Sequence, residues 1–433
     1  MKTTPRSLPR EPVELKVEKL VYGGEGLARQ GGVTYFVPLV APGETVLAEP
    51  MDRRRNFIRA RPLRVLKPAE GRVEPPCPYF GLCGGCHYQH LRYELQLEVK
   101  RDILRETLRR LGGVHWEGPI GVHPSHPFGY RNRAQWKIRP RSSGAGLALG
   151  YFRMGSRSLC PVDQCALLAP PLAEALQALG PALAAEDWPR ELEQIEAFAT
   201  PEGALLLTLT LETLPADPGR VIERLRELLP ATAGVLLHGL ADEQMHLEGP
   251  GFVVYRVAER QFRVGHLSFF QVNRFLLEPL PALVVGETAG GLALDLFAGV
   301  GLFTVELAQR FEQVVAVEAD PAAARDLEHN LGAAGARTRA VNADVVAFLN
   351  GWTDRPDLVV LDPPRSGVPM QALEALARLA PPRIHYLSCD PATLARDLRH
   401  LLGAGYRVEE VQLLDMFPQT YHLEALVRLV HGS

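Results

Sequence analysis

The sequence contains no apolar run long enough to cross a membrane, and it contains only six cysteines. Hydrophobic residues make up 46% of the 433 residues. Charged residues nevertheless interrupt every apolar stretch well before the roughly 20 residues that a membrane-spanning helix requires. The first ten residues have no apolar core and do not resemble a signal peptide. We therefore expect a cytoplasmic protein without a membrane partner, in which cysteines are thiols, metal ligands or nucleophiles rather than disulfides.

Charge is distributed unevenly along the chain, although the net charge is only −3. Residues 1–160 contain 27 Lys and Arg against 14 Asp and Glu, whereas the remaining residues contain 20 against 36. A basic front half indicates that a polyanion binds there, while scattered charges would indicate only a solvated surface. Nothing in the sequence indicates an obligate protein partner, so we expect a monomer.

Residues 11–68 alternate short apolar segments with turns, as in a small β-barrel. Strands are expected at 13–20, 33–40, 44–48 and 57–66, with a glycine-rich turn at 23–26. Six arginines surround an aromatic ring, Phe57, on one of these strands and its lead-in: Arg53, Arg54, Arg55, Arg59, Arg61 and Arg64. Barrels use arginines beside an aromatic ring to hold RNA phosphates and stack bases. The alternative is an edge strand protected by its charge; we favour RNA contact.

Cys77, Cys83 and Cys86 lie in a glycine-rich loop with the spacing C-x5-C-x2-C. Three thiols on a sharply turning backbone indicate metal ligation rather than unrelated buried cysteines. Spacing alone does not separate a tetrahedral zinc ion from an iron–sulfur cluster, and either requires a further ligand. The candidates are Cys160 and Cys165 and, for zinc alone, also His87 and His90.

The middle of the chain predicts a mixed α and β domain. An amphipathic helix is expected at 91–111, and two strands followed by a helix within 193–229. Residues 127–139 alternate basic side chains with Tyr130 and Trp136, which is typical of a nucleic-acid surface.

From residue 292 onward, apolar strands alternate with amphipathic helices, which predicts a parallel sheet covered on both faces. The expected strands are 292–297, 313–318, 338–341, 357–361, 383–388, 406–414 and 423–430, the last two forming an antiparallel pair. The expected helices are 302–310, 322–331, 370–379 and 392–402. Ligands of such sheets bind beyond the carboxyl ends of the strands. That edge collects Asp295, Glu318, Asp344, Asp362 and Cys389.

The first of these strands leads into a glycine loop that is typical of nucleoside binding. Asp295 lies near the end of the strand, and Gly299 and Gly301 let the backbone approach a ligand before a helix begins. Glu318, at the tip of the next strand, is placed to accept both hydroxyls of a ribose. Thr304 occupies the position of the third glycine of the dinucleotide pattern, which favours S-adenosylmethionine over NAD.

Cys389 ends a strand directly before a helix, whose N-terminus is expected to lower the thiol pKa, and we interpret it as a nucleophile. A methyl-transfer site needs a nucleophile when the acceptor carbon is unreactive, as carbon 5 of uracil is. A thiolate that adds to carbon 6 converts the ring to an enolate, whose carbon 5 attacks the sulfonium methyl. A general base must then remove the carbon 5 proton. We prefer Glu424, if burial raises its pKa, over His422, and expect Asp362 to accept from N3–H.

Six segments together resemble the bacterial RNA uracil-C5-methyltransferases, in particular their iron–sulfur-containing 23S rRNA branch. They are CPYFGLCGGCHYQH, FFQVN, DLFAGVGLF, LDPPRSG, SCDPATLARD and MFPQTYHLE, and they extend over nearly the full chain. The resemblance implies a multidomain α/β protein. An N-terminal OB-like TRAM β-barrel at 9–68 would bind RNA, a central α+β iron–sulfur domain would occupy 69–267, and a C-terminal class I (Rossmann-like) methyltransferase domain would occupy 268–433. The implied reaction is covalent methylation of a specific uridine, with 23S rRNA as the expected partner.

The same resemblance implies functions for individual residues. The catalytic residues would be Cys389, as nucleophile, and Glu424, as base. The contacts to S-adenosylmethionine would be Gln271, Phe297, Glu318, Asp344 and Asp362. The ligands of a [4Fe–4S] cluster would be Cys77, Cys83, Cys86 and Cys165, the last chosen because Gln-Cys-Ala-Leu-Leu-Ala-Pro resembles the family's context. One departure concerns Leu302, which stands where that branch has an amide side chain and would remove one polar contact to the cofactor.

Other activities fit the sequence less well. An amino-methyltransferase would carry an aromatic residue after Asp-Pro-Pro, where Arg365 stands, and would not need Cys389. A cytosine-C5 enzyme acting on RNA would bring a second cysteine to the same loop. A tRNA uridine-C5 methyltransferase shares most of the motifs and stays an alternative. A non-enzymatic iron–sulfur RNA-binding protein would have lost the thiol and the base, which are both present.

Overall fold

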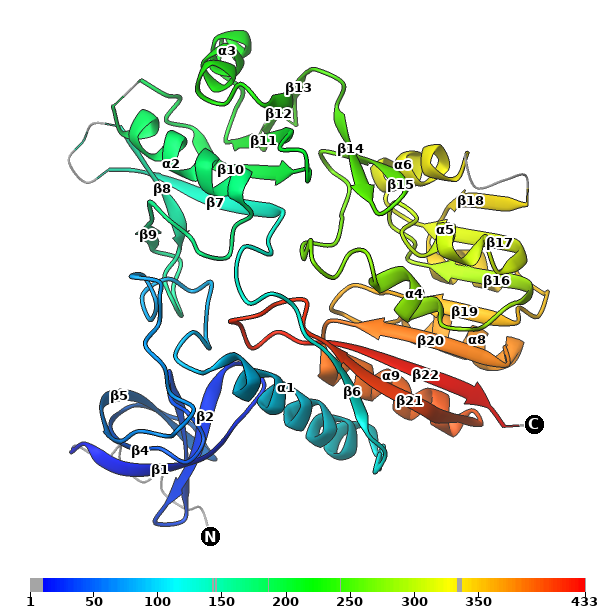
Figure 1. Cartoon of the computed structure of the whole chain (residues 1–433), viewed down its shortest axis with the longest axis horizontal. Helices are drawn as coiled ribbons and strands as arrows, with labels where there is room; N and C mark the ends of the chain where they lie inside the picture. The colour runs from blue at the N-terminus through cyan, green and yellow to red at the C-terminus, as the bar shows by residue number, and fades with distance from the viewer. Residues whose placement is uncertain are drawn as a thin grey trace.

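The structure, a computed structural model, describes residues 11–141, 144, 146–185, 187–241, 243–332 and 337–432. Residues 9 and 10, with which the predicted barrel domain begins, lie outside these ranges. Figure 1 shows a blue barrel near the N-terminus, a green central sheet, and a larger sheet, yellow to red, that ends at the C-terminus. The loops between these three bodies meet near the middle of the molecule.

The N-terminal barrel expected from the sequence is present. Its strands are β1 (Val13–Leu20), β2 (Glu25–Gln30), β3 (Val33–Pro38), β4 (Thr45–Arg53) and β5 (Phe57–Lys67), closed in the order β1-β2-β3-β5-β4. Alternate side chains, among them Leu15, Val17 and Ile58, are buried inside it. We expected only a turn where β2 lies. Gly26 interrupts the apolar pattern there because a Cβ would come within 2.3 Å of Val40.

A seven-stranded sheet forms the central body, in the order β13-β12-β11-β10-β7-β8-β9. Its strands are β7 (Arg133–Pro140), β8 (Leu147–Phe152), β9 (Leu159–Pro161), β10 (Leu192–Ala199), β11 (Leu205–Leu211), β12 (Thr232–Gly239) and β13 (Met245–Glu248). Helices α2 (Pro170–Ala185) and α3 (Pro218–Leu228) pack on it. A hairpin, β14 (Phe252–Val257) and β15 (Arg260–Gly265), shares a core with the C-terminal body. The expected mixture of α and β elements is therefore observed.

The aromatic rings in the stretch that contains β7 do not form the nucleic-acid surface that we predicted, and for its exposed basic side chains RNA contact stays a prediction. Tyr130 and Trp136 are fully buried, because β7 directs every second side chain into the domain core. Arg133 is largely covered as well. Its guanidinium lies 4.6 Å from the ring centroid of Phe198 and pairs with Glu196 at 3.3 Å. The alternation of the sequence reflects a strand with one buried face.

An eight-stranded sheet forms the C-terminal body, in the order β18-β17-β16-β19-β20-β22-β21-β6. Its strands are β6 (Ile120–His123), β16 (Gly290–Leu296), β17 (Phe311–Glu318), β18 (Thr338–Asn342), β19 (Leu358–Leu361), β20 (Arg383–Ser388), β21 (Tyr406–Leu414) and β22 (Glu424–His431). β16 to β20 are parallel, and β22 is antiparallel to both β20 and β21. The predicted alternation and the antiparallel closing pair are both observed.

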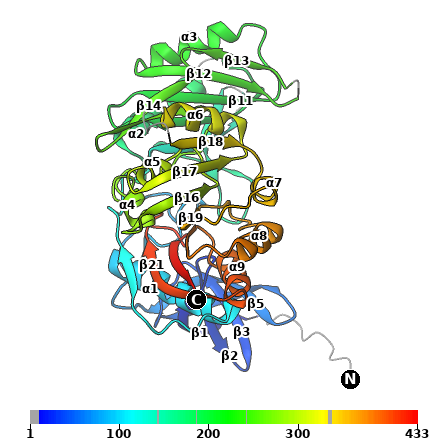
Figure 2. The same cartoon turned by 90° about the vertical axis from the view of Figure 1, so that its right-hand side faces the viewer.

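Helices cover both faces of this sheet, as Figure 2 shows. They are α4 (Leu280–Val285), α5 (Thr304–Leu307), α6 (Pro321–Leu331), α7 (Val345–Asn350), α8 (Met370–Leu379) and α9 (Pro391–Gly403). α7, α8 and α9 pack on one face, and α4 and α5 on the other. α5 is shorter than the helix expected at 302–310, because tighter turns with hydrogen bonds to the third preceding residue flank it. Among the described helices, none is long and apolar enough to span a membrane.

Two elements that precede the central sheet belong to the C-terminal body. β6 pairs in parallel with β21 and forms one edge of the sheet. Helix α1 (Tyr93–Thr107) continues as a wider turn, Leu108–Gly112, that packs against α9 and ends at Gly113. The division at 9–68, 69–267 and 268–433 stays a prediction, and residues 93–123 cross it by adding a helix and an edge strand to the last body.

Candidate active site

The carboxyl ends of three parallel strands bring three acidic side chains to one edge of the sheet, as expected. Asp295 lies one residue before the end of β16, Glu318 is the last residue of β17, and Asp362 follows β19. Asp295 is fully buried, and the other two are half-buried. This edge therefore concentrates carboxyl groups where α/β proteins bind their ligands.

The loop between β16 and α5 leaves its backbone open toward that edge. Phe297 and Gly301 both have positive φ angles, of 64° and 94°. A Cβ on Gly301 would lie 2.8 Å from Leu327, so glycine is required there. The N–H of Gly299 donates to Glu318 Oε2 at 2.8 Å, which places the carboxylate of β17 directly beside the loop.

The other two residues predicted to contact the cofactor differ in their surroundings. Gln271 is 8% exposed, and its Nε2 donates to Asp362 Oδ2 at 3.3 Å, so it belongs to the same edge. Asp344 is exposed beyond β18, and its Oδ1 accepts from the N–H groups of Val346 and Ala347 at 2.9 and 3.1 Å as the cap of α7. Because β18 lies next to β17, Asp344 marks the outer end of this edge.

Burial raises the pKa values of two of these carboxyl groups. The pKa of Asp295 rises to about 7 because of its burial and the charge of Glu318, although a hydrogen bond from Thr304 opposes the change. The pKa of Asp362 also rises to about 7, because of burial and the charge of Asp295, and the bond from Gln271 opposes it. A cation bound beside them would favour their ionised forms.

The segment that carries Gln271 connects this edge to the loop between β21 and β22. Asn132 Nδ2 donates to the carbonyl of Gln271 at 3.1 Å. Two residues further, Asn273 Nδ2 donates to the carbonyls of Asp415 and Met416 at 3.3 and 3.1 Å. The amides of the FFQVN segment therefore fix the predicted cofactor site relative to the loop that precedes the predicted base.

The antiparallel pairing of β20 with β22 brings Cys389 close to Glu424. Ser388, the last residue of β20, pairs with Ala425, so Cys389 directly follows this pair and Glu424, the first residue of β22, directly precedes it. Cys389 is half-buried, and Glu424 is 3% exposed. The predicted nucleophile and the predicted base thus lie on neighbouring strands at the edge that carries Asp362.

The predicted lowering of the Cys389 pKa is wrong for the ligand-free protein. Burial raises the pKa of this thiol to about 12, with further contributions from Glu424 and Asp362, while Arg365 opposes the change. The helix N-terminus acts on Asp390 instead, whose Oδ1 accepts two N–H groups of α9, both at 2.9 Å. The thiol is therefore protonated near neutral pH, and forming the thiolate requires a change in its surroundings.

The two candidate bases differ in basicity. Burial and the charge of Asp362 raise the pKa of Glu424 well above its usual value, and Arg365 partly opposes them. Burial and neighbouring cations, first among them Arg365, lower the pKa of His422 to about 3. A carboxylate of raised pKa is the stronger base, so geometry and basicity both favour Glu424.

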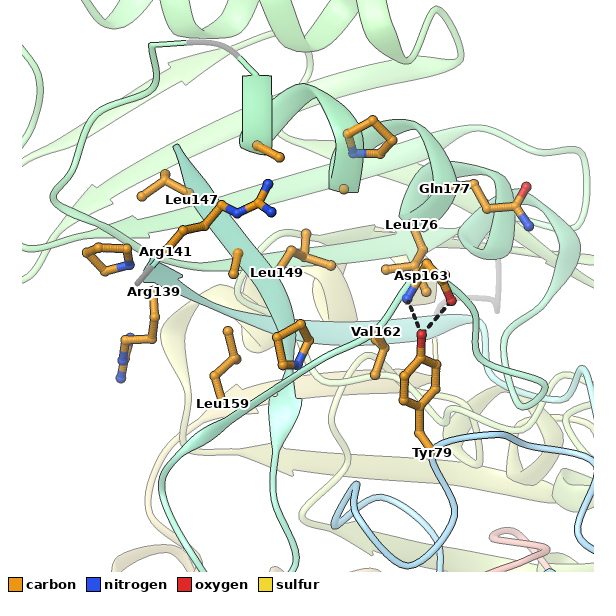
Figure 3. A pocket seen from close by; sticks show the side chains of 16 residues that line it. Tyr79, Arg139, Arg141, Leu147, Leu149, Leu159, Val162, Asp163, Leu176 and Gln177 are labelled. Atoms are coloured by element: carbon orange, nitrogen blue, oxygen red, sulfur yellow. Dashed lines mark hydrogen bonds between the residues drawn. The ribbon is translucent and has the colours of Figure 1, made fainter. Parts of the chain in front are cut away.

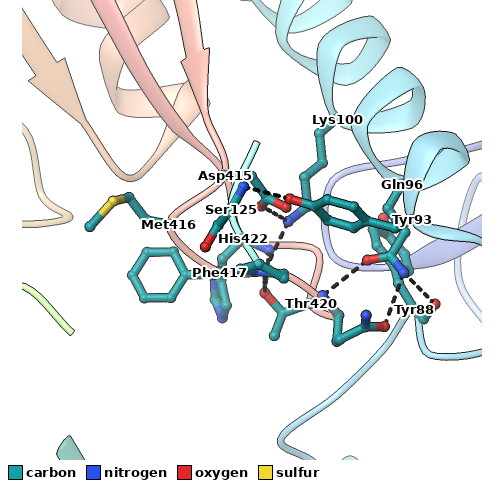
Figure 4. Close-up of polar contacts among 12 residues, drawn as sticks. Tyr88, Tyr93, Gln96, Lys100, Ser125, Asp415, Met416, Phe417, Thr420 and His422 are labelled. Atoms are coloured by element: carbon teal, nitrogen blue, oxygen red, sulfur yellow. Dashed lines mark hydrogen bonds and ion pairs between the residues drawn. The ribbon is translucent and has the colours of Figure 1, made fainter. Parts of the chain in front are cut away.

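A buried ion pair fixes the loop between β21 and β22 (Figure 4). Lys100 of α1 donates to Asp415 Oδ1 at 2.6 Å and to the carbonyl of Phe417 at 2.9 Å, and neither charged side chain is exposed. One turn earlier, Gln96 Nε2 donates to Gln419 Oε1 at 3.0 Å, and Gln96 Oε1 accepts from the Gln419 N–H at 3.0 Å. Helix α1 therefore positions the loop that leads to the predicted base.

Replacement of Lys100 by methionine is expected to destabilise the protein by about 3–5 kcal/mol, because it leaves the Asp415 charge buried without a partner. Urea unfolding would measure the change. The exposed pair of Arg110 and Glu106, at 3.0 Å, provides a control: Arg110→Met should cost less than about 1 kcal/mol. Adding Asp415→Asn to Lys100→Met should recover part of the loss. Equal stability of Lys100→Met and wild type would contradict the structural importance of the pair.

The cysteine loop contacts the same loop between β21 and β22. The backbone N–H groups of His87 and Tyr88 donate to the carbonyl of Gln419 at 2.8 and 3.0 Å. Cys86 packs beside Cys165 around the buried ring of Tyr130. Because this ring also donates from its hydroxyl to the carbonyl of Pro418 at 3.1 Å, the cysteine loop and the predicted catalytic loop share supports.

The four thiols predicted as ligands lie within range of each other's charges. Burial raises the pKa of Cys83 to about 11, and Cys160, Cys165 and Cys77 raise it further. Burial also raises the pKa of Cys86 to about 12, with further contributions from Cys165, Cys83 and Cys77. Cys160 instead lies in the core of the central sheet on β9. Among the described residues, no three His, Cys, Asp or Glu side chains converge closely enough to hold one metal ion.

Comparison with known proteins agrees with this arrangement. Residues 353–431, which include both predicted catalytic residues, match the tRNA (Uracil-5-)-methyltransferase family. The chain is 35% identical to the 23S rRNA (uracil(1939)-C(5))-methyltransferase RlmD of Alkalilimnicola ehrlichii over 97% of each chain. It is 33% identical to an uncharacterized RNA methyltransferase of Aquifex aeolicus, over 97% of this chain and 98% of that one. The chain belongs to the RNA uracil-C5-methyltransferase family.

One solved structure has the same fold as this chain. The tRNA (uracil-54, C5)-methyltransferase of Pyrococcus abyssi, in complex with S-adenosyl-L-homocysteine, matches 96% of this chain and 100% of its own. The TM-score is 0.75 at 24% sequence identity, so the likeness establishes the fold alone. The family and the Rossmann-like C-terminal body that we predicted are confirmed, and the barrel fits the expected OB-like domain. The iron–sulfur branch stays a prediction.

Leu302, where the sequence departs from the 23S rRNA branch of the family, belongs to the apolar core. It is 6% exposed and packs in the cluster that contains Phe303 and Leu307. The side chain therefore faces away from solvent and adds packing rather than a polar contact.

The arginine-rich strand of the barrel is exposed, as RNA binding by this family member would require. The side chains of Arg59 and Arg61 are 56% and 62% exposed, and Arg59 lies 5.9 Å from the ring centroid of Phe57. Arg55 and Arg64 are also exposed, and among the described residues neither has an acidic partner.

A separate cavity of about 730 Å³ lies on the central sheet, between β8, β9 and α2 (Figure 3). Leu147, Leu149 and Leu176 line it, with Arg139 beside them, and the hydroxyl of Tyr79 donates to Asp163 at its rim. None of the residues predicted for the active site lines this cavity, so we do not assign it to the reaction.

Sequence reasoning missed three residues that support the site: Gln96, Lys100 and Tyr22. The first two interrupt the apolar stripe of α1, where Val99 and Ile103 are also buried. Polar residues on an otherwise apolar helix face are a signal that we did not use. Tyr22 lies in a turn of the barrel and carries no local signal.

Proposed function

We propose that this chain transfers a methyl group from S-adenosylmethionine to carbon 5 of a uridine in 23S rRNA. The observation that carries the proposal is the closeness of Cys389, directly after β20, to Glu424, the first residue of β22, and to Asp362 at the acidic edge of the sheet. The names of the similar RlmD enzymes support rRNA as the substrate class. The exposed arginines of the barrel offer it a basic surface.

Each residue would have one part in the reaction. The Cys389 thiol first releases its proton to solvent, the thiolate Sγ then forms a bond to carbon 6 of the uracil, and the electrons of the 5,6 double bond move into an enolate. Carbon 5 then bonds the methyl group that S-adenosylmethionine supplies on its sulfonium, leaving S-adenosylhomocysteine. Glu424 accepts the proton from carbon 5, the double bond reforms, and the bond from carbon 6 to Cys389 breaks. Asp362 accepts a hydrogen bond from N3–H and so orients the ring.

The cofactor would be held by the five residues of the carboxyl edge. Glu318 would accept from the ribose hydroxyls, and the open backbone of the loop at Phe297 would pass close to the nucleoside. Gln271 and Asp362, already joined at 3.3 Å, would lie on the side of the reacting sulfur, and Asp344 at the outer end. The buried carboxyl groups suit a ligand that carries a positive sulfonium.

S-adenosylmethionine should bind more tightly as the pH rises. Asp295 and Asp362 have pKa values of about 7 in the free protein, so below that pH binding of the sulfonium must first release a proton. The Kd should fall by about tenfold between about pH 6 and pH 8 for one such group. Calorimetric titration would measure it. S-adenosylhomocysteine, whose sulfur is neutral, and Asp362→Asn should both show a weaker dependence; an equal slope for both ligands would contradict this role.

We further propose that Cys77, Cys83, Cys86 and Cys165 hold a [4Fe–4S] cluster. The four thiols lie close enough to act on one another electrostatically. A cluster takes each of four thiolates on a different iron, and the loop spacing C-x5-C-x2-C with one further cysteine supplies four. Cys165 is preferred to Cys160 because it packs against the hydrophobic cluster of Cys86, Tyr130 and Leu167, whereas Cys160 belongs to the core of the central sheet. When bound, the cluster would fix the cysteine loop against the catalytic loop.

Protein purified without oxygen is expected to be brown and to contain about four iron and four sulfide atoms per chain. Cys86→Ser should lose this iron, whereas Cys160→Ala should keep it. Elemental analysis and visible absorption would measure both variants. A colourless protein with one zinc ion would contradict the proposed cluster. Loss of iron from Cys160→Ala, with iron retained in Cys165→Ala, would show that Cys160 rather than Cys165 is the fourth ligand.

The proposed activity is tested by methylation of defined RNAs. The purified protein is incubated with radiolabelled S-adenosylmethionine and with transcripts of 23S rRNA or of tRNA, and 5-methyluridine is then mapped by mass spectrometry. Methylation of one uridine in 23S rRNA supports the proposal. Methylation of tRNA alone would show that the same reaction has tRNA as its substrate. RNA binding without methyl transfer to either RNA would indicate a non-enzymatic RNA-binding protein.

A further inference from the structure

The turn between β1 and β2 lies against the catalytic edge of the sheet. Tyr22 is at the tip of this barrel turn, and its hydroxyl donates to Asp390 Oδ2 at 3.2 Å. Its ring also meets the ring of Tyr421 edge-on, with centroids 5.5 Å apart at 87°. One side chain of the barrel therefore contacts both segments that carry the predicted catalytic residues.

The first contact acts beside the nucleophile. Asp390 directly follows Cys389, and its Oδ1 already accepts two N–H groups of α9, which leaves Oδ2 for Tyr22. On the other side of the cysteine, Ser388 Oγ donates to the carbonyl of Asp390 at 3.1 Å and accepts from its N–H at 3.3 Å. Cys389 therefore lies in a hydrogen-bonded turn between Ser388 and Asp390. Tyr22 orients the Asp390 carboxylate, which caps helix α9.

The second contact acts beside the base. The ring of Tyr421 contacts that of His422 at a tilt of 40°, with centroids 4.2 Å apart, and both residues precede Glu424 in the same loop. Its other neighbour is His87 of the cysteine loop, 4.6 Å between centroids. The rings of Tyr22, Tyr421 and His87 therefore join three parts of the chain at one point.

The turn between β1 and β2 packs tightly against His87 and Tyr421, so a movement of the barrel would also move these two side chains. A Cβ on Gly24 would lie 3.2 Å from His87 and 3.3 Å from Tyr421, and the φ of Gly24 is 87°. Burial and the charge of Asp390 raise the pKa of the Tyr22 phenol, so it stays a hydrogen-bond donor at working pH. The contact is then a fixed polar link across the interface.

We propose that Tyr22 is a positioning residue that couples the barrel's hold on RNA to the alignment of Cys389 and Glu424. The inference rests on the proposed methyl transfer. RNA affinity comes from the arginine-rich strand of the barrel, whereas Tyr22 faces the catalytic segments. Removing its hydroxyl therefore changes the rate of the reaction and leaves the affinity for RNA unchanged.

The test compares Tyr22→Phe with Tyr35→Phe, a buried tyrosine on β3 of the same barrel that has no contact with the catalytic segments. Steady-state methyl transfer and RNA binding are measured for both, together with Arg55→Ala as a variant of the exposed arginine-rich strand. Tyr22→Phe should lower kcat about tenfold at unchanged KM for RNA, as loss of one hydrogen bond to a carboxylate predicts. Tyr35→Phe should match wild type, and Arg55→Ala should raise KM alone.

A second readout isolates attack by the thiol. RNA with 5-fluorouridine cannot lose a proton from carbon 5, so the covalent adduct accumulates and its formation can be timed on a denaturing gel. Tyr22→Phe should slow adduct formation by the same factor, with an unchanged Tm and unchanged binding of S-adenosylhomocysteine. Unchanged adduct formation, or a parallel loss of Tm and cofactor binding, would overturn the inference. A wild-type protein that methylates no RNA would instead reject the proposed function.

Discussion

Replacement of Cys389 by alanine is expected to reduce methyl transfer by about 10⁴-fold or more while S-adenosylmethionine binding stays intact. Carbon 5 of uracil does not attack a sulfonium methyl until a nucleophile has added to carbon 6. A thiolate is the strongest nucleophile that the side chains at this edge can form, and Cys389 lies close to Glu424. The loss should therefore appear in kcat, because the cofactor residues are untouched.

The serine variant sharpens this experiment. Cys389→Ser keeps the shape of the side chain but replaces the thiol with a much weaker nucleophile, so it should be nearly as inactive as Cys389→Ala. Titration with S-adenosylmethionine and the Tm of each variant serve as controls for folding. Neither variant should form a covalent adduct with RNA that contains 5-fluorouridine. Turnover within tenfold of wild type in either would exclude covalent catalysis through this residue.

The raised pKa of Cys389 gives the same reaction a pH dependence. At a thiol pKa of about 12 only a small fraction is thiolate at neutral pH, and that fraction grows tenfold for each pH unit. Arg365 is the cation that lowers the pKa of both Cys389 and Glu424. Removing this charge, as in Arg365→Ala, should therefore raise the pKa of both groups.

The acidic edge of the sheet could be predicted because it follows from two local patterns. Strand and helix periods alternate, and parallel strands necessarily end at the same edge, so Asp295, Glu318 and Asp362 had to meet. The pairing of Cys389 with Glu424 could not be derived in this way. It depends on β22 inserting between β20 and β21, which no local periodicity encodes. The family motifs named both residues without their geometry.

The errors have a common physical origin in burial by distant segments. The helix N-terminus predicted a lowered pKa for Cys389, but desolvation and two carboxyl groups outweigh it. Tyr130 and Trp136 sit in a basic stretch, yet the central domain covers both rings. Tyr22 carries no local signal, and the position of Lys100 on the apolar face of α1 does not name its partner; each supports the site through a partner more than 300 positions away. Such contacts require the tertiary structure.

Replacement of Glu424 by glutamine should reduce turnover by about 10³-fold and trap a covalent complex of protein and RNA. The amide cannot accept the proton from carbon 5, so the methylated adduct forms but Cys389 cannot leave. Unlike Cys389→Ala, this variant should still produce one equivalent of S-adenosylhomocysteine per enzyme. The adduct should appear as a slow band on a denaturing gel and contain both the methyl label and the RNA.

His422→Gln is the matched control, because it changes the competing base in the same loop. The pKa of His422 is lowered to about 3, whereas that of Glu424 is raised, so the histidine is the much weaker base. His422→Gln should therefore release methylated RNA, with a smaller loss of rate from altered packing against Tyr421. The opposite result would be a trapped adduct with His422→Gln and free release of product with Glu424→Gln. In that case the imidazole of His422 would accept the proton from carbon 5, and Glu424 would position the uracil ring rather than deprotonate it.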